Sequence, residues 1–87
     1  MLNTTLTFIE DPGHGWLQVP LTELDQLNIR SEITPCSYKN GRFAYLEEDC
    51  DMNVYLDARR AQGFPPPAFN RTYTHHFTGR DRYDHFS

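Results

Sequence analysis

Apolar and polar residues alternate over residues 4–10, TTLTFIE, and several of these side chains are β-branched or aromatic. Alternation with a period of two predicts a strand with one buried face. Residues 11–15 follow with Asp, Pro and Gly, which form tight turns because Pro presets φ and Gly permits positive φ. Residues 16–19 predict a second short strand, so we expect a hairpin at the start of the chain.

A short helix is predicted after this hairpin. Leu21, Leu24 and Leu27 repeat at helical spacing directly after Pro20, a residue that opens helices. Glu23 lies near the start, where an acid suits the helix dipole.

The next two segments, residues 32–39 and 42–48, flank Asn40 and Gly41. Asn-Gly is the strongest short-range hairpin signal, because a type I′ turn needs positive φ twice. Pro35 cannot donate a hydrogen bond to a neighbouring strand, so we expect an edge strand or a bulge there. The turn fixes a register that pairs Lys39 with Arg42, Tyr38 with Phe43, and Cys36 with Tyr45.

A second helix is expected next, capped by Asp49 or Asp51 and ended by Gly63. Its apolar stripe consists of Val54, Tyr55, Ala58 and Ala61, with Met52 and Leu56 at the margins.

After a connector with three prolines, residues 68–77 alternate again and predict a last strand. The predicted order is ββαββαβ, which favours an α+β fold with a small antiparallel sheet and two helices. Eighty-seven residues suffice for one domain. We therefore expect a single domain over residues 1–87, with residues 78–87 as a candidate mobile tail.

The net charge of −4 is unevenly divided along the chain. Residues 1–57 hold ten acids and three bases, whereas residues 58–87 hold five arginines and two acids. An acidic total argues against binding double-stranded DNA, which needs a broad basic face. The basic last third leaves room for a compact anion.

No apolar run reaches the roughly 18 residues of a membrane span, and the first residues lack the basic start of a signal peptide. We therefore expect a cytoplasmic protein without a membrane partner, and reduced thiols at Cys36 and Cys50.

A ligand site is the first functional hypothesis. Guanidinium groups bind phosphates, aromatic rings stack on bases, and a histidine between glycines can approach an anion closely. The alternative is a plain tight turn and a solvated last strand that complete the core. The candidate ligand-binding residues are His14, Trp16, Tyr38, Arg71, Tyr73, His75, Arg80 and Arg82.

An acidic run, Glu47, Glu48, Asp49 and Asp51, is the candidate protein-interaction surface. Such a run stabilises a helix N-terminus, binds Mg²⁺ or Ca²⁺, or mimics nucleic-acid charge toward a basic protein. Its spacing does not fit an EF-hand, and the histidines and cysteines lack zinc-site spacing, so neither a metal nor a cofactor is expected.

Two longer motifs carry a family resemblance. Residues 11–17, DPGHGWL, continue into Val19 and Pro20, and Ser37 and Tyr38 precede residues 45–51, YLEEDCD. In these motifs the chain resembles a family of small uncharacterised proteins encoded by phages, prophages and plasmids. The resemblance implies an accessory protein in a host cytoplasm and supplies no activity.

The preferred hypothesis is a non-enzymatic counter-defence protein that binds a host defence protein or sequesters a small nucleotide signal. The enzyme alternative is a small metal-independent nuclease or phosphodiesterase that uses His14 and an arginine. A third alternative is a self-associating interaction domain, a homodimer formed through the edge strand expected at Pro35.

Overall fold

The computed structural model describes residues 2–75 and the backbone of residues 84 and 85. Its helices are α1 (Leu21–Gln26), α2 (Asp51–Ala61) and a short 3₁₀ helix, η1 (Arg30–Glu32). Its strands are β1 (Thr5–Glu10), β2 (Gly15–Pro20), β3 (Tyr38–Asn40), β4 (Phe43–Glu47), β5 (Ala68–Tyr73) and β6 (Asp84–His85). Within the described residues, no helix has the length and apolar content needed to cross a membrane.

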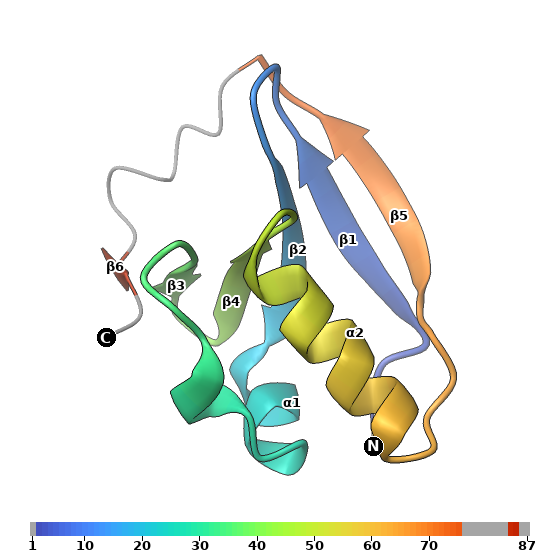
Figure 1. Ribbon diagram of the computed structural model, residues 1–87. Coiled ribbons are helices and arrows are strands. Elements are labelled where there is room, and N and C mark those ends of the chain that lie inside the picture. Colours follow the sequence, from blue (N-terminus) through green and yellow to red (C-terminus); the bar gives the residue numbers. More distant parts are fainter. Residues whose placement is uncertain (1, 76–83, 86–87) are drawn as a thin grey trace.

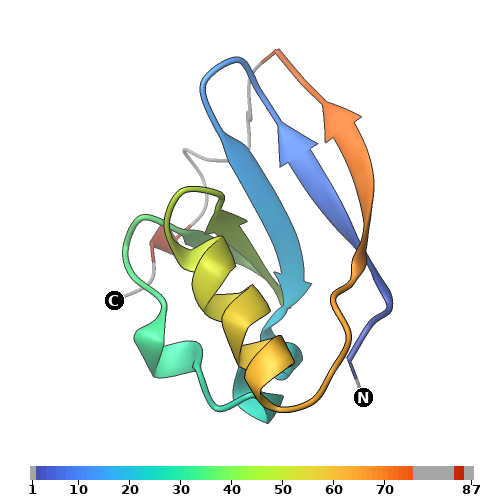
Figure 2. The same ribbon diagram turned by 45° about the vertical axis from the view of Figure 1, so that its right-hand side comes forward.

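The strands form one mixed sheet in the order β5-β1-β2-β4-β3-β6 (Figure 1). The α+β class with two helices is confirmed, but the wholly antiparallel sheet is wrong, because β5 runs parallel to β1. The cause is the path of the chain. From β4, α2 crosses one face of the sheet and returns the chain to the end where β1 begins (Figure 2). Parallel strands need a crossover connection of this kind.

One face of the sheet packs against the helices and forms the main core. Alternate residues of three strands point to this side: Leu6, Phe8, Leu17, Val19, Ala44 and Leu46. They meet Leu24 and Leu27 from the α1 region and Met52 and Tyr55 of α2. Burying each large side chain contributes roughly 1.5–3 kcal/mol, so this layer supplies most of the folding energy.

The opposite face of the sheet is apolar as well. Trp16 and Tyr45 are buried there, and Ile9, Tyr38 and Phe43 pack against them. Tyr38 lies directly across from Tyr45, in the place where Cys36 was expected. The sheet therefore buries apolar residues on both sides.

The turn between β1 and β2 confirms the first predicted hairpin. Asp11 Oδ1 accepts hydrogen bonds from the backbone N–H groups of Gly13, at 3.0 Å, and His14, at 2.7 Å. The Asp11 N–H donates to the His14 carbonyl at 2.9 Å. An aspartate at this position stabilises the turn with its own side chain.

The second hairpin forms one position later than expected. Asn40 pairs with Phe43, so the loop residues are Gly41 and Arg42. Gly41 has a φ of +61°, and Arg42 does not have a positive φ. This sign pattern belongs to a type II′ turn, which needs glycine first, and not to type I′. The predicted register, with Lys39 opposite Arg42, is therefore wrong.

The segment before this hairpin is not a strand. Residues 32–37 form the end of η1 and a turn, and β3 begins only at Tyr38. The edge strand expected at Pro35 is therefore wrong, and β6 pairs with the outer side of β3. The rest of the candidate tail lies outside the described residues. The opposite edge of the sheet is β5.

Both α-helices end in the same way. Gly63, with a φ of +86°, follows α2, and its N–H donates to the Arg60 carbonyl at 3.1 Å. The Phe64 N–H donates to the Arg59 carbonyl at 2.9 Å, which completes a Schellman motif and confirms the predicted stop. Asn28, with a φ of +60°, makes the equivalent turn after α1.

Candidate functional site

Three of the predicted ligand-binding residues form a row of rings. The ring centroids of His14 and Trp16 are 5.7 Å apart, and those of Trp16 and Tyr38 are 5.4 Å apart. Trp16 is only 2% exposed, so it anchors the row, while His14 is exposed in its turn. The His14 Nδ1 lies 3.9 Å from Asp11 Oδ1, close enough for an ion pair when the imidazole is protonated.

The β5 residues among the candidates point to the other face of the sheet. Arg71 pairs with Phe8 across the parallel strands, and its guanidinium carbon lies 5.1 Å from the Phe8 ring centroid. Arg71 Nη1 also donates to Glu10 Oε1 at 3.1 Å. Phe8 belongs to the α2 side and Trp16 to the opposite side. The sheet therefore separates Arg71 from the row of rings.

Tyr73 and His75 lie at the end of β5. Tyr73 is 61% exposed, and its ring centroid is 5.8 Å from that of His75. Because β5 runs parallel to β1, this end lies beside the turn that holds His14 (Figure 1). Arg80 and Arg82 lie outside the described residues, so their convergence with His14 remains a prediction.

The acidic run does not present its carboxylates together. Asp51 is fully buried, and its Oδ2 accepts hydrogen bonds from the hydroxyls of Ser37, at 2.5 Å, and Thr34, at 2.9 Å. The Thr34 N–H also donates to this carboxylate, at 3.1 Å to each oxygen. Asp51 therefore fastens the segment before β3 to the start of α2. It lies in the interior and not on the surface expected to bind a protein.

The remaining acids of the run lie in the turn before α2. Glu48 and Asp49 are exposed, and Glu47 Oε1 accepts a hydrogen bond from the Asp49 N–H at 2.7 Å. The N-cap of α2 is Cys50, without a side-chain capping bond. Capping by Asp49 or Asp51 is therefore wrong, because the buried Asp51 carboxylate binds Thr34 and Ser37 instead.

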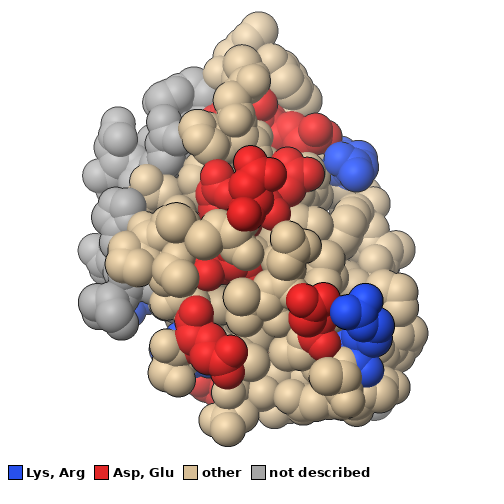
Figure 3. All heavy atoms as spheres, in the orientation of Figure 1, with Lys and Arg blue, Asp and Glu red and all other residues tan. Residues whose placement is uncertain are grey.

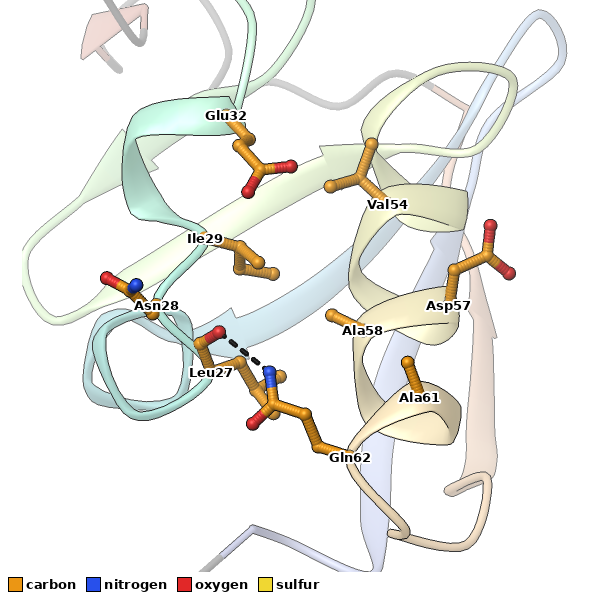
Figure 4. Close-up of a pocket in the computed structure, with 9 residues that line it drawn as sticks. All are labelled: Leu27, Asn28, Ile29, Glu32, Val54, Asp57, Ala58, Ala61 and Gln62. Atoms are coloured by element: carbon orange, nitrogen blue, oxygen red, sulfur yellow. Dashed lines mark hydrogen bonds between the residues drawn. The ribbon is translucent and has the colours of Figure 1, made fainter.

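A groove of about 540 Å³ lies between α2 and the segment that runs from the end of α1 to η1 (Figure 4). Its lining is mixed. The apolar residues are Leu27 and Ile29 on one wall and Val54, Ala58 and Ala61 on the other, and the polar residues are Asn28, Glu32, Asp57 and Gln62. Glu32 points across the groove toward Val54, whereas Asp57 lies on the outer side of α2. Gln62 Nε2 donates to the Leu27 carbonyl at 2.9 Å and joins the walls at one end.

The face of the molecule that carries α2 has many acidic groups (Figure 3). Two arginines, one in α2 and one in β5, are paired: Arg60 with Asp57 at 2.9 Å, and Arg71 with Glu10 at 3.1 Å. Such exposed pairs cancel locally and contribute little to stability. Three exposed acids form no ion pair within the described part of the chain: Glu32, Glu48 and Asp49.

A buried polar cluster joins α1 to α2. The Tyr55 hydroxyl donates to Glu23 Oε1 at 2.5 Å, and Arg59 Nη1 donates to the Tyr55 oxygen at 2.9 Å. Arg59 also donates to the carbonyls of Asn3 and Pro65. Burial, followed by the Glu23 carboxylate, raises the pKa of Tyr55 well above its ordinary value. Buried hydrogen bonds therefore fix the position of α2 against α1.

The sequence analysis did not identify this groove, because its walls come from two separate segments. One signal was available: Asn28 stands directly after a Leu-rich helical pattern, where a left-handed residue ends the helix. Across residues 2–75, no three His, Cys, Asp or Glu side chains converge as metal ligands would.

The structure thus offers two separate surfaces. One is a groove of mixed polar and apolar lining with one inward carboxylate, on an acidic face, and the other is a row of rings on the opposite side of the sheet. The chain matches no protein-family model, and the searches of curated proteins and of solved structures found no similar protein.

Proposed function

We propose that this chain is a non-enzymatic binding module and that the groove beside α2 holds a segment of a partner protein. Glu32 supports the proposal: it is exposed, forms no ion pair within residues 2–75, and points across a groove that also contains apolar side chains. A matching segment carries an apolar side chain for the lining and a Lys or Arg beside it. Grooves of this kind bind helices and short peptides through such anchors.

The proposed partner is a host defence protein with a basic, partly apolar segment. The resemblance to phage and plasmid proteins suggests this setting, and the acidic face suits it. A field of one sign attracts an oppositely charged partner and speeds the encounter without a specific contact. The proposed result is inhibition of the host protein by occupation of its basic surface.

The experiment is a selection of displayed random peptides on the purified, immobilised chain. We expect the enriched peptides to combine Leu, Ile, Met or Phe with Lys or Arg. Synthetic versions should lose at least about tenfold in affinity for Glu32→Lys, because a like charge then faces the peptide cation. Ala61→Arg, which places a long side chain in the groove, should weaken the same peptides.

Asp49→Lys is the matched control, since it makes the same charge change outside the groove. Equal or greater weakening by Asp49→Lys would assign binding to the turn before α2. Enrichment of peptides without cations, or of none, would reject the groove as the site.

Nucleotide capture is the second proposal, and the ring row formed by His14, Trp16 and Tyr38 supports it. Purified protein would be incubated with RNA and with cyclic nucleotides, with and without EDTA. Recovery of an intact nucleotide after denaturation favours capture. Turnover by catalytic amounts of protein favours the alternative of a small nuclease or phosphodiesterase.

Self-association is the third proposal. Strand β5 is an edge of the sheet, and most of its residues are exposed. Edge strands can pair across a two-fold axis. Light scattering over a range of protein concentrations distinguishes a homodimer from a monomer.

A further inference from the structure

Cys36 and Cys50 are 14 positions apart in the sequence, and both contact the hydroxyl group of Thr34. The Thr34 Oγ1 lies 3.4 Å from the Cys50 sulfur and accepts a hydrogen bond from the Cys36 N–H at 3.2 Å. Because both cysteines contact this one oxygen, they are neighbours in space, and the Cys36 thiol acts on the pKa of the Cys50 thiol. Both thiols are free, so the structure holds an adjacent dithiol.

Rigid contacts hold the two cysteines in this arrangement. Cys36 lies in the turn that leads to β3, and Cys50 is the N-cap of α2. Between them, the buried Asp51 carboxylate accepts hydrogen bonds from Thr34 and Ser37, which fixes the turn against the helix. The proximity of the two cysteines therefore follows from a hydrogen-bond network around the buried Asp51.

We propose that Cys36 and Cys50 form a thiol–disulfide exchange site that reacts with small disulfides of the glutathione class and closes reversibly into an intramolecular disulfide. The proposal is independent of the groove and of its partner. Disulfide geometry requires closely spaced Cβ atoms, and two cysteines that contact the same hydroxyl group are near that requirement.

The exposure of the two thiols gives them different roles. Cys36 is exposed and Cys50 is half-buried. The Cys36 thiolate attacks the small disulfide, forms a mixed disulfide and releases one small thiolate. The Cys50 thiolate then attacks the Cys36 sulfur and releases the second. Two protein thiols are oxidised, and one small disulfide is reduced to two thiols, which take up the two protons that the protein thiols lose.

The environment of Cys50 makes the second step dependent on pH. The Thr34 hydroxyl lowers the pKa of the Cys50 thiol, but the Cys36 thiol, burial and the Asp51 carboxylate raise it above its usual value. Because the thiolate is the nucleophile, ring closure should accelerate as the pH rises.

The test uses the full-length chain in buffers of reduced and oxidised glutathione, quenched with acid and measured by intact mass. We expect the wild type to lose about 2 Da, the mass of two hydrogens, and to regain them with excess reduced glutathione. Cys50→Ser should instead accumulate a stable glutathione adduct, because its Cys36 sulfur has no neighbour to displace the adduct. Cys36→Ser should react much more slowly.

The wild type alone decides the proposal if a variant fails to fold. A persistent wild-type adduct without the loss of two hydrogens, or disulfide-linked dimers in place of an internal bond, would overturn it. A thermal melt gives an independent readout, since a disulfide between Cys36 and Cys50 constrains the unfolded chain. We expect the oxidised protein to melt at a temperature higher by at least about 4 °C.

Discussion

The Tyr55 hydroxyl donates a hydrogen bond to the Glu23 carboxylate at 2.5 Å, and this contact joins the middle of α2 to α1 in the interior. Both residues are buried, and the Glu23 carboxylate also accepts the Asn3 N–H at 2.9 Å. Glu23 therefore has two roles: its charge suits the first turn of α1, and its carboxylate anchors α2 through Tyr55.

Tyr55→Phe should destabilise the protein by about 1–3 kcal/mol at neutral pH, because the buried Glu23 and Arg59 lose a partner while the ring still fills its space. Urea unfolding followed by circular dichroism measures this free energy. Tyr73→Phe is the matched control, since Tyr73 is exposed and should stay within about 0.5 kcal/mol of the wild type. Equal effects of the two variants would contradict the structural role of the cluster.

The raised pKa of Tyr55 predicts a loss of stability in alkali. The native chain holds this phenol proton more tightly than the unfolded chain, whose Tyr has a pKa near 10.0. The stabilisation is therefore complete below pH 10 and declines as the pH rises above 10 toward the native pKa. The difference in unfolding free energy between wild type and Tyr55→Phe should shrink as the pH rises from about 10 to about 12. A constant difference across that range would show that Tyr55 does not titrate differently on folding.

Gly15 predicts a second stability effect, because the backbone approaches two side chains there. A Cβ at Gly15 would lie 2.4 Å from the Phe8 Cζ and 2.8 Å from Glu48 Oε1. Gly15→Ala should therefore cost about 1–3 kcal/mol through overpacking. Gly13→Ala, two residues away with open space around it, should change stability by less than about 0.5 kcal/mol. Thermal melts of the two variants measure the contrast.

Substitutions of the buried Asp51 and the exposed Asp49 should differ in their effect on the unfolding free energy. Asp51→Ala leaves the Thr34 N–H and two hydroxyls without their buried acceptor, so we expect a loss of about 3 kcal/mol or more. Asp49→Ala removes an exposed carboxylate and should leave the unfolding free energy within about 0.5 kcal/mol. If the two variants unfold at the same denaturant concentration, the Asp51 network does not support the fold.

The elements that sequence analysis predicted well were those defined by local signals. The 4–19 hairpin, the Leu-rich helix and the Gly63 stop follow from period, turn chemistry and backbone freedom. The wrong predictions concern features that depend on contacts between distant parts of the chain. The pairing of β5 with β1 depends on how far α2 crosses the sheet, which no local pattern encodes.

In the candidate site, too, local features could be predicted from the sequence and contacts between distant residues could not. The acidic run was visible in the sequence, but the burial of Asp51 depends on Thr34 and Ser37, 17 and 14 positions away. Glu32 is an ordinary surface acid in the sequence, and it gains its interest only because α2 lies beside it to form a groove. Periodicity identifies which residues are buried in an element, and it does not identify which elements meet.

Substitutions at Gly63 and Asn28 should affect stability differently, because each residue ends a helix with a positive φ. A Cβ at Gly63 would meet no atom within 4 Å, so any cost of substitution comes from φ alone. Gly63→Ala should destabilise by about 1 kcal/mol, whereas Gly63→Asn should cost less, because Asn tolerates this conformation. Asn28→Gly should be neutral or slightly stabilising for the same reason. Chemical unfolding of the three variants tests the ranking, and an alanine at position 63 that unfolds like the wild type would contradict the Schellman motif at the end of α2.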